Sequence, residues 1–317
     1  MTGRAAYRGA VHPFRFGVTA SRAGSADEWT ALARRAEVLG YDTLLMPDHL
    51  GRQLSPFSAL TAAALATTRL RVGPFVLAND YRHPLIVARE AATLDLLSGG
   101  RLELGLGAGW NRRDYRSLGI PYDRPGVRVD RLVESVDIVC RLLAGETVDH
   151  HGPHYTLTSA RLSPPTVQRP RPPIMVGGGG PRILRLAARA ADIVALQPQM
   201  DPRGRPIIRQ ATEAATWAKV ALVREVAGER FDRLELNVIV ADAGLAGSGR
   251  PPLESLSAAA RAAVVGLVGT PYVMYGTLAR LRDVLLRRRE RLGISYYALP
   301  ARAMEAMAPL VGALAGR

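Results

Sequence analysis

The sequence PPIMVGGGGP, residues Pro172–Pro181, joins a short apolar strand to the start of a helix. The strand is Ile174–Val176, and apolar residues recur at helical spacing after Pro181. The four glycines between them leave backbone N–H groups uncovered, and proline suits the first position of a helix. Because amides that converge on a helix N-terminus bind phosphate, Gly177–Gly180 predict a phosphate cradle. A flexible turn is the alternative interpretation.

Seven further segments repeat this order of strand, turn and helix along the chain. Most of the predicted strands in these segments are continuous apolar runs, which is typical of parallel strands covered on both faces. The eight predicted strands are residues 14–19, 41–46, 70–77, 101–106, 174–176, 191–197, 234–240 and 294–299. Helix-start and helix-stop signals lie between them. The alternation predicts an α/β fold, a (β/α)8 TIM barrel formed by one domain over residues 1–317.

The regular order is interrupted at two places. The third strand contains Gly73-Pro74, which predicts a bulge, because a central strand does not tolerate proline in regular pairing. Thr147–Thr158 resembles a hairpin, and Ser163–Pro173 is rich in proline and predicted to be extended. We therefore predict an insertion over about residues 146–173, between the fourth helix and the fifth strand.

The later helices are less regular. Their predicted ranges are 207–227, 253–265, 270–292 and 301–314, and residues 241–252 are predicted to form a loop.

Composition and charge limit the possible partners. The formal charge is +14, and of 42 basic residues only Lys219 is a lysine. This use of arginine is typical of a GC-rich genome, and no basic run is interleaved with aromatic residues, so no nucleic-acid partner is predicted. Arg287–Arg289 lies on a periodic helix and is interpreted as a solvated face. The excess positive charge favours an anionic small ligand.

The compartment follows from what the sequence does not contain. A single cysteine, Cys140, excludes an intramolecular disulfide and is interpreted as a small core residue. No apolar run is long enough to span a bilayer, and Met1–Pro13 has no apolar segment typical of a signal peptide. We predict a cytoplasmic protein without a membrane partner.

In a (β/α)8 barrel the chemistry lies at the carboxyl ends of the strands. His49 is the only histidine directly at a predicted strand end, and its ordinary pKa range suits a general acid. Its neighbour Asp48 is a candidate to orient it. The alternatives are that His49 caps a loop and that Asp48 is an N-cap. The other candidates at strand ends are Asn79, Gly107, Gly109, Trp110, Gly177, Gly178, Gly179 and Gly180.

Two of these side chains could instead have a purely structural role, and two motifs elsewhere in the sequence do not predict a site. Trp110 either covers the barrel rim or forms a wall for a ring-shaped ligand, and Asn79 is either a ligand contact or a turn residue. The three histidines within 150–154 are interpreted as a hairpin tip, so no metal site is predicted. The glycines of 105–109 do not have the spacing of a dinucleotide-binding motif.

Several of these segments resemble a known family. Leu94–Trp110, LDLLSGGRLELGLGAGW, is similar to the region around strand four of the bacterial luciferase-like flavin monooxygenase superfamily. Arg82–Pro84, Pro172–Gly180 and Val268–Pro271 also resemble it, and the resemblance extends from about Phe14 to Gly316. Arg288–Ser295 and Met304–Ala306 are similar to the actinobacterial branch that depends on coenzyme F420.

The resemblance implies a barrel that holds a flavin or 5-deazaflavin at its strand ends. It implies that Gly177–Gly180 hold the cofactor phosphate, that Asp48-His49 lies near the reactive face, and that Asn79 approaches the ring carbonyl or the ribityl chain. It also implies a strand-three bulge at Pro74–Leu77, often with a non-prolyl cis peptide. In the sugar-phosphate dehydrogenases of the family a glutamate occupies the position of Trp110, which argues against such a substrate here.

The leading functional hypothesis is an F420-dependent oxidoreductase that transfers a hydride between the deazaflavin and a small organic substrate. In it His49 protonates the substrate or stabilises charge, and Gly107 and Trp110 line the cofactor. The alternative is a monooxygenase that uses reduced FMN and O2. A third hypothesis is a non-catalytic flavin-binding barrel. By the same resemblance, a homodimer is expected.

Overall fold

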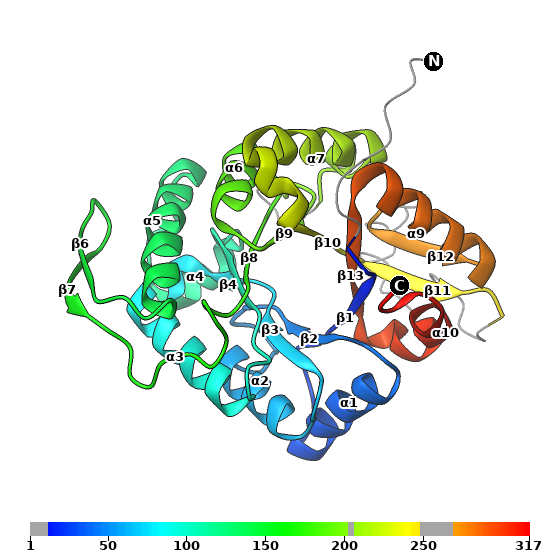
Figure 1. The fold of residues 1–317 in the computed structure, drawn as a ribbon, viewed down its shortest axis with the longest axis horizontal. Coiled ribbons are helices and arrows are strands. Elements are labelled where there is room, and N and C mark those ends of the chain that lie inside the picture. Colours follow the sequence, from blue (N-terminus) through cyan, green and yellow to red (C-terminus); the bar gives the residue numbers. More distant parts are fainter. Residues whose placement is uncertain (1–11, 202–205, 248–268) are drawn as a thin grey trace. The chain divides into compact units, whose positions relative to one another are not determined.

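The computed structural model describes residues 12–201, 206–247 and 269–317 (Figure 1). By its internal contacts the chain divides into two compact units. The first comprises residues 1–19, 38–42 and 178–317, and the second comprises residues 20–37 and 43–177. Each predicted candidate at strands two to four lies in the second unit, whereas Gly178–Gly180 belong to the first.

The second unit contains five parallel strands. These are β2 (Thr43–Met46), β3 (Arg71–Pro74), β4 (Leu77–Ala78), β5 (Leu104–Gly107) and β8 (Ile174–Gly178), whose last residue enters the first unit. Strand β2 pairs with β3, and β5 pairs with both β4 and β8. Because each pair is parallel, the loops that follow these strands leave from the same edge.

The predicted third strand is broken at the position where proline predicted a bulge. β3 ends at Pro74 and β4 begins at Leu77, and the peptide bond between Phe75 and Val76 is cis, as the resemblance implied. The break lies against β5. A Cβ added to Gly105 would overlap the carbonyl oxygen of Pro74, so glycine is required for this close approach.

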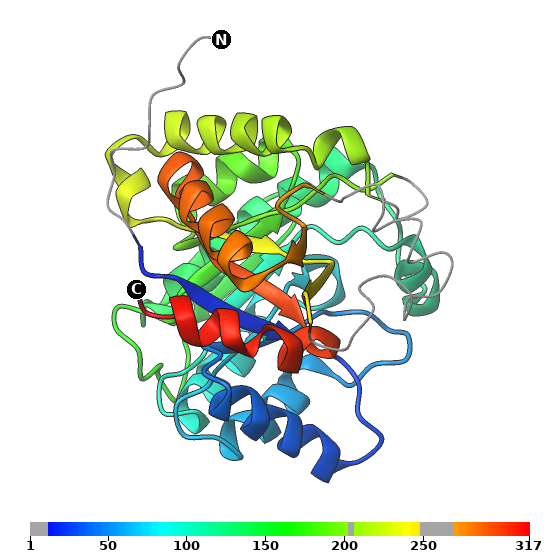
Figure 2. The ribbon, with the colours of Figure 1, turned by 90° about the vertical axis from the view of Figure 1, so that its right-hand side faces the viewer.

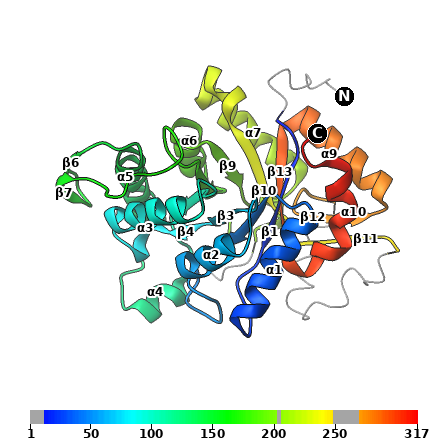
Figure 3. The same cartoon turned by 60° about the horizontal axis from the view of Figure 1, so that its bottom comes forward.

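Helices and a hairpin complete the second unit. The helices are α1 (Ala26–Val38, whose last residue is in the first unit), α2 (Pro56–Leu65), η1 (Asn79–Tyr81), α3 (Pro84–Leu97), α4 (Arg112–Leu118) and α5 (Pro125–Leu143). The predicted hairpin is confirmed as the antiparallel pair β6 (Val148–His151) and β7 (Thr156–Ala160), which lies beside α5 (Figure 3). Helix α4 was not predicted.

Four parallel strands of the first unit pair in the order β1, β13, β10, β9. Their bounds are β1 (Arg15–Thr19), β13 (Ile294–Pro300), β10 (Glu235–Ile239) and β9 (Ile193–Leu196). Its helices are α6 (Pro181–Ala190), η2 (Ile208–Gln210), α7 (Glu213–Ala227), η3 (Gly228–Arg233), α9 (Leu278–Leu292), η4 (Ala301–Ala303) and α10 (Met304–Leu314). Helices α9 and α10 pack side by side (Figure 2).

Several later elements differ from their predictions. The long helix begins at Glu213, where Thr212 accepts a hydrogen bond from the backbone of Ala215, and not at residue 207. Two strands were missed, the parallel pair β11 (Asp242–Leu245) and β12 (Val273–Gly276). Strand β12 replaces the first turns of the helix predicted from residue 270, and the predicted helix over 253–265 lies outside the described residues.

All eight predicted strands have a counterpart, the third as β3 and β4 together. The fold is a (β/α)8 barrel, as predicted. Among the described residues, no helix is both long and apolar enough to cross a membrane.

Candidate active site

His49 and Asp114 form a hydrogen-bonded pair in the second unit. His49 follows β2, and its Nδ1 lies 2.8 Å from Oδ2 of Asp114 in α4. An ionised carboxylate only accepts, so Nδ1 donates in this bond, and Nε2 is the ring nitrogen that Asp114 does not contact. The imidazole side chain is 33% exposed, whereas Asp114 is buried, with 4% of its side chain exposed. Among the described residues no hydrogen bond to Nε2 is present, so this nitrogen at the end of β2 is a candidate for proton transfer.

Asp114 is fixed by further donors. Its carboxylate accepts hydrogen bonds from Asn111 Nδ2 at 2.9 Å, the Tyr81 hydroxyl at 3.3 Å and the backbone N–H of Leu50 at 3.4 Å. Burial, followed by the charge of Asp114, raises the pKa of Tyr81, so this phenol stays protonated and continues to donate. A carboxylate with several donors holds its position, which in turn holds the imidazole of His49.

The local sequence explains why Asp114 stands there. Asn111 caps α4 by accepting a hydrogen bond from the backbone N–H of Arg113, and Asp114 follows three positions later. Gly119 ends the helix in the left-handed conformation, with φ of 70°. Neither signal had led to a predicted helix at this position. An Asn-x-x-Asp pattern directly after a glycine-rich strand end was the cue that could have revealed α4 and Asp114.

Asp48 has a different set of partners from the one expected. Its Oδ2 lies 2.7 Å from Arg82 Nη1 and accepts from the backbone N–H of Ala78 at 3.0 Å, and Oδ1 accepts from Arg82 Nη2 at 3.1 Å. The residue is buried. Asp48 therefore links the end of β2 to the end of β4, and the carboxylate that orients His49 is Asp114.

Asn79 and Trp110 differ in their exposure to solvent. Asn79 is buried, and its Nδ2 donates to the Tyr155 hydroxyl of the hairpin segment at 3.0 Å. Trp110 is 42% exposed, and its ring meets the imidazole of His49 edge-on, with centroids 5.3 Å apart. The indole thus forms one side of the space in front of His49 and presents an apolar surface there.

Two of the predicted cofactor glycines are required by the protein itself. A Cβ on Gly107 would lie 2.6 Å from Val76 Cγ2. Gly109 has φ of 70°, and a Cβ there would overlap the hydroxyl of Tyr115. Close packing and the left-handed backbone account for glycine at both positions. Both strand-end positions remain candidates for cofactor contact through their backbone.

The glycines at the end of β8 lead into α6 as predicted. Gly180 is the N-cap and Pro181 the first helical residue. A Cβ on Gly179 would overlap the carbonyl oxygen of Gln197, so this glycine is explained by packing. A Cβ on Gly180 would meet nothing closer than Gln199 Nε2 at 4.0 Å. Among the described residues, no atom therefore crowds the side-chain position of Gly180 at the helix N-terminus.

Lys219 is buried beside the segment that follows β9. Its Nζ donates to the carbonyl oxygens of Gln197 at 2.7 Å and Gln210 at 2.8 Å. Burial lowers the pKa of this ammonium to about 8. The amine holds the segment after β9 in place, and both of its partners are backbone atoms of the first unit.

The three hairpin histidines do not gather around a common point with acidic residues. His150 Nε2 lies 2.8 Å from Oε1 of Glu134, whose carboxylate also accepts from the backbone N–H groups of His154 and Tyr155. In the described part of the chain, no group of three potential metal-binding side chains is present. Glu134 anchors the hairpin to α5.

A parallel α/β barrel with polar side chains at its strand ends is a common enzyme scaffold. The family model described as luciferase-like monooxygenase matches residues 8–309. The chain belongs to the luciferase-like monooxygenase family.

Relatives of known sequence include both uncharacterised and named proteins. An uncharacterised protein of Mycobacterium tuberculosis is 34% identical over 182 residues, which are 50% of this chain and 62% of that protein. An F420-dependent glucose-6-phosphate dehydrogenase of Microbacterium testaceum is 32% identical over 189 residues, 57% of this chain and 55% of the relative. A 5,10-methylenetetrahydromethanopterin reductase of Archaeoglobus fulgidus is 32% identical over 159 residues, 50% of this chain and 45% of the relative. The matches thus span about half the length of these relatives.

Solved structures share the fold over nearly the whole chain. The coenzyme F420-dependent tetrahydromethanopterin reductase of Methanopyrus kandleri has a TM-score of 0.74 at 19% identity, covering 94% of this chain and 98% of that one. A monooxygenase of Streptomyces bottropensis has a TM-score of 0.74 at 24% identity, covering 93% and 98%. At these identities the likeness shows the fold alone. Among the named relatives and neighbours are oxidoreductases and monooxygenases.

Proposed function

We propose that this protein is an F420-dependent oxidoreductase that transfers a hydride between the 5-deazaflavin and a small organic substrate. The observation that carries the proposal is the hydrogen bond between His49 Nδ1 and Asp114, which leaves Nε2 available at the end of β2. Relatives at 32% identity that are named as F420-dependent support the choice of cofactor. A bound deazaflavin would supply the hydride chemistry; the protein supplies position and proton transfer.

Each residue has a defined part in the proposal. His49 gives a proton to the substrate, or takes one from it, through Nε2 as the hydride is transferred. Asp114 keeps Nδ1 protonated and stabilises the imidazolium. Asp48 is the second residue that we assign to the catalytic group, and it acts by holding Arg82 and the end of β4.

The remaining candidates hold the cofactor. Gly177–Gly180 are proposed to bind its phosphate at the N-terminus of α6, where the backbone around Gly180 is open. Gly107, Gly109 and Trp110 are proposed to line the cofactor, with Trp110 excluding water beside His49. Asn79 is proposed to approach the ring carbonyl or the ribityl chain; its amide nitrogen donates one hydrogen to Tyr155 and has a second to donate.

Cofactor titration tests the proposal directly. Fluorescence titration of the purified protein with F420 and with FMN should give a lower Kd for F420. If FMN binds at least about tenfold more tightly, which corresponds to about 1.4 kcal/mol, the F420 assignment is wrong.

The proton-transfer role is tested separately. His49→Ala should abolish most turnover while F420 still binds, because removing a general acid costs about 10²- to 10⁴-fold in rate. His151→Ala, on the exposed hairpin, is the matched control and should leave turnover unchanged. Unchanged turnover in His49→Ala would remove His49 from the mechanism.

An FMN-dependent monooxygenase is the second candidate function. It is favoured by the family description and by the monooxygenases among the structural neighbours. The same glycines would serve it, because FMN also carries a phosphate. Consumption of O2 in the presence of reduced FMN and substrate would distinguish it. A non-catalytic flavin-binding barrel would bind the cofactor and show no turnover with any electron acceptor.

A further inference from the structure

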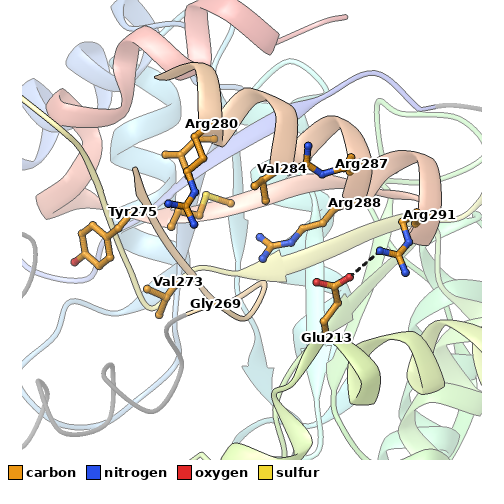
Figure 4. Close-up of a pocket in the computed structure, with 11 residues that line it drawn as sticks. Glu213, Gly269, Val273, Tyr275, Arg280, Val284, Arg287, Arg288 and Arg291 are labelled. Carbon is orange, nitrogen blue, oxygen red and sulfur yellow. Dashed lines mark hydrogen bonds and ion pairs between the residues drawn. The ribbon is translucent and has the colours of Figure 1, made fainter. Parts of the chain in front are cut away.

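A pocket of about 280 Å³ lies in the first unit between β12, α9 and the start of α7 (Figure 4). It shares no residue with the candidate active site. Its walls are partly apolar, with Val273, Met274, Leu281 and Val284. Its polar lining is almost entirely cationic.

Four arginines of α9 line this pocket. Arg287, Arg288 and Arg291 follow Arg280 by seven, eight and eleven residues, so the four side chains project from one side of the helix. Among the described residues, Glu213 is the one acidic residue of the lining, and it lies 3.4 Å from Arg291. The lining therefore carries four positive charges and one negative charge.

Arg288 is the buried member of the cluster, whereas Arg280, Arg287 and Arg291 are exposed, so the solvated face predicted for Arg287–Arg289 holds for Arg287 but not for Arg288. Arg288 is only 8% exposed, and its Nε has no hydrogen-bond partner among the described residues. Figure 4 shows the guanidinium groups of Arg288 and Arg280 directed toward the same space beside Val273. A buried guanidinium without a full set of acceptors is costly, and an anion in that space would offset the cost.

We infer that this pocket binds a phosphate group, either as free phosphate or on a phosphorylated small molecule. A phosphate carries up to two negative charges near neutral pH, which complements the net positive lining better than a single carboxylate does. The planar guanidinium forks of Arg280 and Arg288 match phosphate oxygens in pairs. The apolar wall formed by Val273 and Val284 leaves room for a small organic substituent.

Calorimetric titration at fixed ionic strength tests this site with inorganic phosphate, glycerol 3-phosphate and acetate. Wild-type protein should bind at least one phosphate compound and not acetate. Arg280→Gln should weaken binding about tenfold or more, since a hydrogen bond to a charged group is lost. Arg282→Gln removes the same charge from α9, but Arg282 does not line the pocket; binding should change less than about twofold.

The two sources of the phosphate give different results. Tighter binding of glycerol 3-phosphate indicates a phosphorylated small molecule, and equal binding indicates the free ion; both support the site. Gly180→Ala separates this pocket from the glycine cradle, because a Cβ fits there without overlap. Loss of phosphate binding in Gly180→Ala but not in Arg280→Gln would overturn the inference, as would equal weakening in Arg282→Gln.

A thermal measurement gives an independent readout. Ligands that bind only the folded state raise its melting temperature, so phosphate should raise Tm in the wild-type protein. Arg288→Met removes the buried charge and should make this rise smaller while retaining the fold. If Arg288→Met does not fold, Arg280→Gln provides the same comparison. A phosphate-dependent rise as large in both variants as in the wild-type protein would refute the assignment.

Discussion

Gly105→Ala tests the close packing of β5 against the broken third strand. The added Cβ would overlap the carbonyl oxygen of Pro74 and would lie 3.3 Å from its carbon and 3.0 Å from Val76 Cγ1. Two of these three atoms belong to the backbone, which does not move aside as a flexible side chain does. The segments around Gly105 and Pro74 must separate by about 1 Å to restore an ordinary contact.

The expected cost exceeds that of an ordinary overpacked core. Overpacking typically costs about 1–3 kcal/mol, and a displaced backbone in a parallel sheet also weakens the ladder, so we expect at least about 3 kcal/mol. For a chain of this size such a loss lowers Tm by about 4–5 °C or more. Strand β5 ends at Gly107 and pairs with β4, which leads directly into Asn79, so the displacement would also reach these two candidate residues.

Gly312→Ala is the matched control. Gly312 lies in α10, is exposed, and has no atom within 4 Å of the position of its Cβ. Alanine there should stabilise the protein by about 0.5–1 kcal/mol because of its higher helix propensity. Urea denaturation followed by tryptophan fluorescence measures both variants. Wild-type stability of Gly105→Ala would show that β3 and β5 are not packed as closely as described.

Three further outcomes are expected. NMR of the single lysine side chain should show that Lys219 titrates with a pKa of about 8. Because the unfolded state then binds more protons than the folded state from about pH 8 to pH 10, the free energy of unfolding of the wild-type protein should rise with pH in this range. In Lys219→Met this rise should be absent. Burial raises the pKa of Glu37, but hydrogen bonds from the backbone of residues 68–70 outweigh this effect and lower the pKa. Glu37→Gln should therefore be less stable than the wild-type protein at pH 7. This difference in the free energy of unfolding should disappear as acid protonates the carboxyl group in the folded state. Trp29→Phe should cost about 1–3 kcal/mol in urea denaturation, since Trp29 Nε1 donates to the carbonyl oxygen of Ala59 at 2.7 Å and that buried acceptor would lose its donor.

Local sequence signals were sufficient for most of the fold. Apolar runs bounded by glycine and proline predicted all eight barrel strands, and Gly73-Pro74 predicted the break that separates β3 from β4. The pair β11 and β12 was missed because β11 contains Asp242 and Gly244, which are typical of a loop, and β12 directly follows the helix-start signal at Thr270-Pro271. Similarly, Thr270-Pro271 carries the signals of a helix start, but Thr277 is the residue that caps α9.

The site was predicted less completely, because its defining contact joins distant residues. Sequence adjacency suggested Asp48 as the partner of His49, yet side chains of consecutive residues leave a strand end in different directions. The carboxylate that meets His49 comes from Asp114, 65 positions away. No periodicity encodes such a contact; only the cap at Asn111 marks the short helix that delivers it.

The glycines at the strand ends differ in how strongly they indicate a bound ligand. Glycine at a strand end indicates either an approaching ligand or an approaching part of the protein, and sequence does not distinguish the two. Here Gly107 meets Val76, Gly109 has a left-handed backbone, and Gly179 meets Gln197, so the chain itself requires all three. Gly180 is bordered by open space at the start of α6. Of the four residues of the cradle, Gly180 therefore gives the strongest structural reason to expect a bound phosphate, and the chemistry must be decided at His49 and Asp114.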